Sequence, residues 1–358
     1  MVRTQLKEVC EVRWGDTTVT KASYVEEGYP AFSASGCDGF LPYYDHDGYG
    51  IVVSAIGAQC GKTWYARGQW SCIKNTIYIK SKSSEADIRY VFYTLSDPQV
   101  WPKRGAAQPF ISQTDARNVE IPLPSLSIQR RIASILSAYD ELIENSQRRI
   151  KILESMARSL YREWFVHFRF PGHESVPLVP SLLGEIPRGW EVKKLGDIAQ
   201  LNYGKALKKE DRRDGEYPVY GSSGIVGSHD TALVQGPGIV VGRKGNVGSV
   251  FWSNSDFFVI DTAYYVTSSL PLHFLFYVLP TLNFINSDAA VPGLNRNQAY
   301  TLELLVPPAS LLEKFCELVD TFELQVSTLE QQIQTLRRTR DLLLPRLLSG
   351  QIDVESLQ

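Results

Sequence analysis

The sequence predicts an α+β protein in which two pseudo-symmetric, β-rich domains are separated by two long helices that pack on each other. Three segments occur twice in the same order, and each copy ends in a long stretch of helical periodicity. The repeated segments are 29–36 with 217–224, 50–57 with 238–245, and 106–124 with 289–307. The first two pairs lie 188 residues apart and the third 183. Because solenoid units repeat at no more than roughly 50 residues, each copy is large enough to be a domain.

Each copy begins with a β-rich part. In the first copy, three short segments are rich in β-branched and aromatic residues and are punctuated by glycine, which is typical of strands. These segments are 51–56, 62–66 and 75–80, and we expect them to form short strands of a mixed sheet. Residues 86–95 have helical spacing, with a counterpart at 273–279, and predict a helix that packs on the sheet in each copy.

The two long helices are expected at 125–170 and 309–350. Apolar or small residues recur in each at spacings of three and four, with the same break in register, a stutter, in both copies. The expected seam positions are Ile128, Ile132, Ile135, Tyr139, Leu142, Ser146, Ile150, Leu153, Ala157, Leu160 and Trp164, then Leu311, Phe315, Leu318, Phe322, Gln325, Leu329, Ile333, Leu336, Arg340, Leu343 and Leu347. About 40 residues at about 1.5 Å each make a rod of about 60 Å.

Two members of this seam are polar, Gln325 and Arg340. Either they fix the register or face a partner, or they lie at the edge of the seam, and the sequence leaves both interpretations open. Pro345 is expected to kink or end the second helix, because proline lacks the N–H that a helix needs. A Pro- and Gly-rich linker is expected between the two halves. The resulting boundaries are 1–124 and 189–308 for the domains, 171–188 for the linker and 351–358 for a tail.

The composition narrows the function. The chain has 358 residues, of which 44% are hydrophobic and 21% charged, and a net charge of −2. This charge argues mildly against a protein that coats nucleic acid, but allows local basic patches. The sequence has neither a membrane span of roughly 20 apolar residues nor an export signal at its start, so we expect a cytoplasmic protein. The five cysteines lack CxxC spacing, so neither a disulfide framework nor a zinc site is expected.

The motifs of the common catalytic sites are missing. The five histidines show no metal-ligand spacing, and the chain contains neither a GxSxG elbow nor a Walker loop. The glycines of GPGIVVG at 236–242 lead into a strand pattern, whereas a dinucleotide fingerprint leads into a helix. Residues 305–308 lack the acceptor side chain of an amino-methyltransferase motif, and the triplet at 191–193 lacks the upstream aspartate of a nuclease. We therefore expect a binding and scaffolding protein without a cofactor of its own.

Four further stretches carry a family resemblance: PLPSLSIQRRIASIL at 122–136, SLYREWFVHFRF at 159–170, LGEIPRGWEVKKLGDIAQLNYGK at 183–205 and LLLPRLLSGQI at 342–352. In addition, TQLKEVCEVRWG at 4–15 matches KKLGDIAQLNYG at 193–204. Each motif is weak alone, but in this order and repeated they are specific. Over nearly its whole length the chain resembles the specificity subunit of type I restriction-modification systems.

This resemblance implies two target-recognition domains, each reading one half of a bipartite, asymmetric site in double-stranded DNA. It further implies that the two helices are antiparallel, form a coiled coil, and act as a spacer and a docking surface for two modification subunits. S-adenosylmethionine would bind those subunits, and ATP with Mg would serve restriction subunits that join for cleavage. Two alternatives remain open: a structural adaptor with degenerate recognition domains, and an enzyme that itself acts on nucleic acid.

Base reading requires side chains with a fixed donor and acceptor geometry, mainly Arg, Lys, Asn and Gln. In the second domain the candidates lie in a glycine-rich loop after a strand and in the last repeated segment: Arg243, Lys244, Asn246, Asn295, Arg296 and Asn297. In the first domain the equivalent segments, with two residues that precede the second of them, offer Gln59, Lys62, Lys103, Arg104, Ser112, Gln113 and Thr114.

Phosphate contacts are expected from lysines near the start of the second domain: Lys205, Lys208 and Lys209. For the mixed-sign run 208–213, a solvated surface is the favoured alternative. For each of the other candidates, a solvated position is as good an interpretation as a DNA contact.

Overall fold

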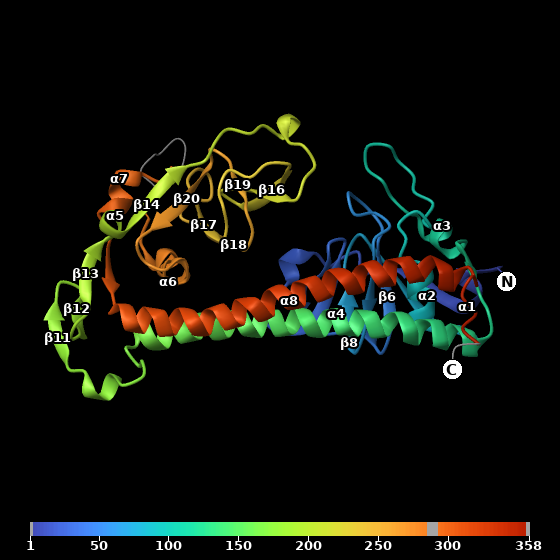
Figure 1. The fold of residues 1–358 in the computed structure, drawn as a ribbon. Helices are drawn as coiled ribbons and strands as arrows, with labels where there is room; N and C mark the ends of the chain where they lie inside the picture. Colours follow the sequence, from blue (N-terminus) through green and yellow to red (C-terminus); the bar gives the residue numbers. More distant parts are fainter. Residues whose placement is uncertain (1–2, 285–292, 356–358) are drawn as a thin grey trace. The chain divides into compact units, whose positions relative to one another are not determined.

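The computed structural model describes residues 3–284 and 293–355 in two compact units. Unit 1 takes the described residues up to Gln147 and from Gln331 onward, and unit 2 takes those from Arg148 to Glu330. Residues 289–292, which begin the last repeated segment, and the end of the expected tail lie outside the described residues. Both units combine sheets with helices (Figure 1), so the α+β class is confirmed.

The main sheet of unit 1 has four strands in the order β2, β9, β6, β7, and all neighbours are antiparallel. The strands are β2 (Cys10–Trp14), β6 (Gly50–Ser54), β7 (Thr63–Ala66) and β9 (Thr76–Ser81). The three predicted strands are therefore confirmed, but their sheet is not mixed. A parallel pair occurs instead in a second sheet, between β3 and β8. The sequence indicated the strands without indicating which strand pairs with which.

The predicted short helix of the first domain is α2 (Ile88–Thr94), which packs against β6 and β7. Asp87 begins this helix by accepting hydrogen bonds from the backbone N–H groups of Arg89 and Tyr90, each at 3.0 Å. The remaining elements of the domain are β1 (Arg3–Gln5), α1 (Leu6–Val9), β3 (Tyr29–Ser33), β4 (Gly36–Leu41), β5 (His46–Asp47), β8 (Gln69–Cys72), α3 (Gln113–Arg117) and β10 (Glu120–Pro122).

Unit 2 repeats this architecture with the strand order β14, β20, β17, β18. The sheet consists of β14 (Ala199–Tyr203), β17 (Gly238–Gly242), β18 (Val250–Ser253) and β20 (Ala263–Ser268), and α6 (Leu272–Val278) lies against β17 and β18 (Figure 1). Even the irregularities repeat, because a bulge between Ala31 and Phe32 recurs 188 residues later between Val219 and Tyr220. The predicted two-fold repeat is thus confirmed at the level of strand pairing.

The other elements of the second domain follow the first domain closely. They are β13 (Glu191–Lys194), α5 (Leu195–Ile198), β15 (Tyr217–Gly221), β16 (Gly224–His229), β19 (Phe258–Val259), α7 (Arg296–Tyr300) and β21 (Glu303–Val306). The expected linker contains an antiparallel hairpin of β11 (Leu178–Ser181) and β12 (Gly184–Pro187).

The long helices are α4 (Leu126–Tyr161) and α8 (Ala309–Leu348). The first ends earlier than predicted, because a π-helical turn at Arg162–Val166 follows it and Phe168 has a positive φ of 58°. Pro345 does not stop the second helix at once, since α8 continues for three more residues to Leu348. No helix in the described part of the chain is long and apolar enough to cross a membrane.

In each unit the two helices run antiparallel. In unit 1, Leu136 shares a hydrophobic cluster with Leu347, while Asp140, one turn further along α4, pairs with Arg340, which lies earlier in α8. In unit 2, the rings of Trp164 and Phe315 lie 6.1 Å apart, and Ala157 belongs to the same cluster. Near the C-terminus, Val354 is buried in the cluster of unit 1.

The seam differs from the prediction at three positions. Leu142 is 53% exposed and Leu318 42%, and Gln325 is also exposed. Their C-terminal neighbours are buried instead: Ile143, Val319 and Val326 are 7%, 0% and 5% exposed. With these residues, the buried and half-buried positions alternate by three and four without a stutter in both copies. The equivalent positions are still 183 residues apart. They are Leu136, Tyr139, Ile143, Ser146 and Ile150 in α4, and Val319, Phe322, Val326, Leu329 and Ile333 in α8.

Arg340 remains within the seam and is half-buried. Its Nη1 donates to Asp140 Oδ1 at 2.5 Å, and the Tyr93 hydroxyl donates to the other oxygen of the same carboxylate at 2.6 Å. This network joins both helices to α2, so the polar residue fixes the register. The repeat places Ala157 of the first copy at the position equivalent to Arg340, and Glu323 of the second copy at the position equivalent to Asp140.

Candidate nucleic-acid interface

The structure brings together the two candidate segments of the second domain. The loop between β17 and β18 carries Arg243, whose backbone N–H donates to Thr262 and whose carbonyl oxygen accepts from the N–H of Leu294, at 2.9 and 2.8 Å. Lys244 forms an isolated bridge with Gly293. Residues 243–244 and 293–294 therefore lie side by side, although some 50 residues separate them in the sequence.

Two of the predicted arginines converge on one aromatic ring. The guanidinium carbons of Arg243 and Arg296 lie 4.8 and 4.9 Å from the ring centroid of Tyr203, the last residue of β14. Arg243 also lies 5.8 Å from the ring of Tyr264 and Arg296 6.0 Å from that of Tyr300. A cation over an aromatic face is attracted by the ring quadrupole. We call these five residues the Arg–Tyr cluster.

Hydrogen bonds tie the Arg–Tyr cluster to the sheet. Arg243 Nη1 donates to the carbonyl oxygen of Asp261 at 3.0 Å, and the Tyr300 hydroxyl accepts from the N–H of Leu201 at 2.9 Å. Burial, with the neighbouring Tyr203 as a further cause, raises the pKa of Tyr264 to about 12, so its hydroxyl stays protonated. Tyr203 itself is 49% exposed, which leaves the cluster open to solvent on one side.

The first domain has the same loop arrangement with different side chains. The N–H of Gly57 donates to Pro109 at 2.9 Å and that of Ile111 to Ala55 at 2.8 Å. Ala55, however, stands where the second domain has Arg243, and it is fully buried. Gln113 stands where the second domain has Arg296, and both donate to equivalent strand carbonyls: Gln113 to Val12 at 2.9 Å and Arg296 to Leu201 at 3.5 Å.

The other candidates of the first domain surround this loop. Gln59 and Lys62 are exposed, and Lys62 Nζ lies 5.8 Å from the Trp64 ring. Lys103 reaches the loop, since a Cβ added at Gly61 would meet its Cε at 2.8 Å. Arg104 instead pairs with Asp115 at 2.7 Å.

Ser112 and Asn295 occupy equivalent positions in the two domains, and each caps the N-terminus of a short helix. Ser112 caps α3 by accepting from the N–H of Asp115 at 3.0 Å, and Asn295 caps α7 by accepting from Asn297 and Gln298. Hydrogen bonds from Ser112 and Arg104, in that order, hold the pKa of the Asp115 carboxyl below its usual range. The S-x-x-D pattern at 112–115 is a signal from which this cap was predictable.

The remaining candidates of the second domain are open to solvent. The exposed candidates are Asn246, Asn297, Lys205, Lys208 and Lys209. Thr114, which stands at the position of Asn297 in the first domain, is also exposed. The run 208–213 is partly structural, because Arg212 Nη1 donates to the Val226 carbonyl oxygen at 2.6 Å and Arg213 pairs with Asp230 at 3.4 Å.

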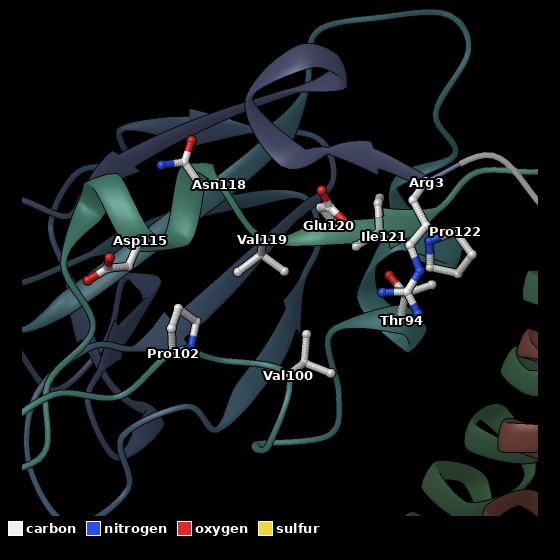
Figure 2. A pocket seen from close by; sticks show the side chains of 10 residues that line it. All are labelled: Arg3, Thr94, Val100, Pro102, Asp115, Asn118, Val119, Glu120, Ile121 and Pro122. Atoms are coloured by element: carbon white, nitrogen blue, oxygen red, sulfur yellow. The ribbon is translucent and has the colours of Figure 1, made fainter.

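The described residues contain no group of three or more His, Cys, Asp or Glu suited to hold a metal ion. A hollow of about 500 Å³ lies in the first domain. Among the side chains that line it, Arg3 lies at one end and Asp115 at the other (Figure 2). Its charged groups do not converge on one point, as the groups of an active site do.

Comparison with known proteins agrees with this geometry. Residues 1–155 and 187–338, one stretch for each repeat, match the family model of the type I restriction modification DNA specificity domain. The chain belongs to this family. The resemblance noted in the sequence and the internal repeat of the family domain are thereby confirmed.

Other members of the family are similar along much of the chain. The type I restriction enzyme MjaIX specificity subunit of Methanocaldococcus jannaschii is 26% identical over 71% of this chain, which spans 65% of that relative's length. A putative type I specificity subunit of Mycoplasma pneumoniae is 22% identical, with 88% of this chain and 87% of the relative covered. A crystal structure of a type I restriction-modification system S subunit from M. genitalium shares the fold, with a TM-score of 0.61, 19% identity and coverage of 97% of this chain and 95% of that one.

Proposed function

We propose that this chain is the DNA-binding specificity subunit of a type I restriction-modification complex, in which each domain reads one half of a bipartite, asymmetric site. One observation carries the proposal: the two domains have the same backbone arrangement but different side chains at equivalent loop positions. Ala55 and Gln113 in the first domain correspond to Arg243 and Arg296 in the second. To read two different half-sites, two domains with the same backbone arrangement need different hydrogen-bond donors and acceptors at their base-reading positions.

The helices α4 and α8 are proposed to hold the two domains apart and to dock two modification subunits. Exposed apolar side chains on these helices support this role, because they are not needed for the seam between the helices. They are Leu142 at 53%, Ile152 at 52%, Met156 at 47%, Leu324 at 70% and Leu342 at 57% exposed. Restriction subunits would join the complex for cleavage. The proposal places the chain in the cytoplasm, where its DNA lies.

In this proposal the chain is not itself an enzyme and holds no cofactor. S-adenosylmethionine would bind the modification subunits, and ATP with Mg the restriction subunits. The chain supplies the choice of sequence, which is a property of binding free energy and requires no reacting group in the recognition domains.

A methylation map tests the proposal. The chain is expressed with its modification subunit in a host that lacks other methyltransferases, and methylated bases are mapped with and without the chain. A gapped, asymmetric two-part motif that disappears without the chain is the expected result. Methylation that persists unchanged without the chain would favour an adaptor with degenerate recognition domains. Methyl transfer by the purified chain alone would contradict its non-catalytic role.

A further inference from the structure

The Arg–Tyr cluster of the second domain contains two cations that lack an anionic partner among residues 3–284 and 293–355. Neither Arg243 nor Arg296 forms an ion pair with a carboxylate within these ranges, although both guanidinium groups lie within 5 Å of the Tyr203 ring centroid. Each donates to one backbone carbonyl, at 3.0 and 3.5 Å. A guanidinium has five N–H donors, so most of them remain available to a ligand.

Two like charges that share one ring repel each other, and an electron-rich ligand between them relieves that repulsion. The aromatic contact also restricts the rotamers of both side chains, so less conformational entropy is lost when they bind. A planar, oriented guanidinium matches the O6 and N7 acceptors of guanine in the major groove. The same geometry also matches a phosphate, so geometry alone does not distinguish a base contact from a phosphate contact.

The two domains differ at the positions of these arginines. Phosphates are the same in both half-sites, so groups that contact them are expected at equivalent positions of both domains. The arginines occur in one domain only, since Ala55 and Gln113 replace them in the other, and Trp14 replaces Tyr203. Residues that change between equivalent scaffolds are those expected to read bases.

We propose that Arg243 and Arg296 read guanine in the half-site of the second domain, and that Tyr203 is a positioning residue that holds both guanidinium groups. This inference rests on the proposed function. It also implies that the first domain reads its half-site without arginine at these two positions.

The test selects DNA sequences with the full chain in complex with its modification subunits. A library randomised over both half-sites is bound, recovered and sequenced for the parent chain and for Arg243→Ala, Arg296→Ala and Arg243→Lys. The parent is expected to select guanine in one half-site. Each alanine variant should lose about 5- to 150-fold of its preference at one or two of those guanines. Arg243→Lys should lose much of it, because lysine does not reproduce the bidentate fork.

Tyr203 is tested by two variants that differ in the ring. Tyr203→Leu should weaken discrimination at the guanines read by both arginines, while Tyr203→Phe, which keeps the ring, should restore it. A merely structural role of Tyr203 would lower total binding without changing which base is preferred. The half-site of the first domain is the internal control for folding, because its preference should persist in every variant.

The possible failures are distinguishable. If the parent selects no two-part motif, the proposed function fails. If the parent selects such a motif but the second half-site lacks guanine, or the alanine variants keep the same preference, this inference alone is wrong. A loss of affinity that is uniform across sequences, with a salt dependence reduced by about one counterion, would make the arginines phosphate contacts and would also overturn it.

Discussion

Truncation of Ile143 should destabilise the helix pair more than truncation of its neighbour Leu142. Ile143→Ala and Leu142→Ala each remove three carbon atoms, but Ile143 is 7% exposed and Leu142 53%. At about 0.8 kcal/mol per buried CH₂, the lost burial is about 2 kcal/mol for Ile143, and the cavity left behind raises this toward about 3 kcal/mol. The loss for Leu142 is about 1 kcal/mol or less, because half of its side chain is already in water and alanine favours the helix.

Urea unfolding followed by far-UV circular dichroism measures the difference, and hydrogen exchange of the α4 amides reports it locally. The local measurement matters because a chain of two compact units need not unfold in one step. Val326→Ala and Gln325→Ala form the equivalent pair on α8, where the first residue is 5% exposed and the second is exposed. Equal losses within each pair, or a larger loss at Leu142, would refute the regular seam and restore the stuttered one.

Three further predictions concern charge and reactivity. A double-mutant cycle of Arg340→Ala and Asp140→Ala should give a coupling of about 1 kcal/mol, between the values of exposed and buried pairs, and no coupling would contradict a register role. Burial, and then the negative charges of Glu154, Glu330 and Asp320, raise the pKa of Glu323 in the folded state above its pKa in the unfolded chain. The contribution of Glu323 to stability is therefore fully present below the unfolded-state pKa and is lost as the pH rises through the folded-state pKa. Glu323→Gln should consequently raise the unfolding midpoint more at pH near 7 than at pH near 4, and an equal effect at both would refute this assignment. Of the five cysteines, Cys37 is exposed and should be alkylated first, a rank that timed alkylation with peptide mapping checks.

The repeat made the fold predictable to the level of domains, strands and helices. Strand identity depends on local composition, so the segments around 51–56 and 75–80 were found from their β-branched residues. Strand pairing depends on contacts distant in the sequence, which is why the sheet was wrongly expected to be mixed. The predicted register of the seam was wrong for a similar reason. Leu142 and Ile143 are adjacent and both are apolar, and the helix that packs against them decides which of the two is buried.

The candidate interface was predictable in its loops but not in its geometry. Arg243 and Arg296 were found because their residue type suits base reading. Tyr203 was missed, since its role exists only where the end of β14, the loop after β17 and the start of α7 meet. The capping roles of Ser112 and Asn295 were predictable from their residue types at the starts of α3 and α7, although the prediction for both was DNA contact. Whether these two also touch DNA stays a prediction.

A domain exchange tests whether each domain reads its own half-site. Residues 189–308 are replaced by the corresponding domain of another specificity subunit, and methylated bases are mapped in cells that also express the modification subunit. We expect a new two-part motif in which one half-site is replaced and the other is kept. A motif changed in both halves, or in neither, would contradict it.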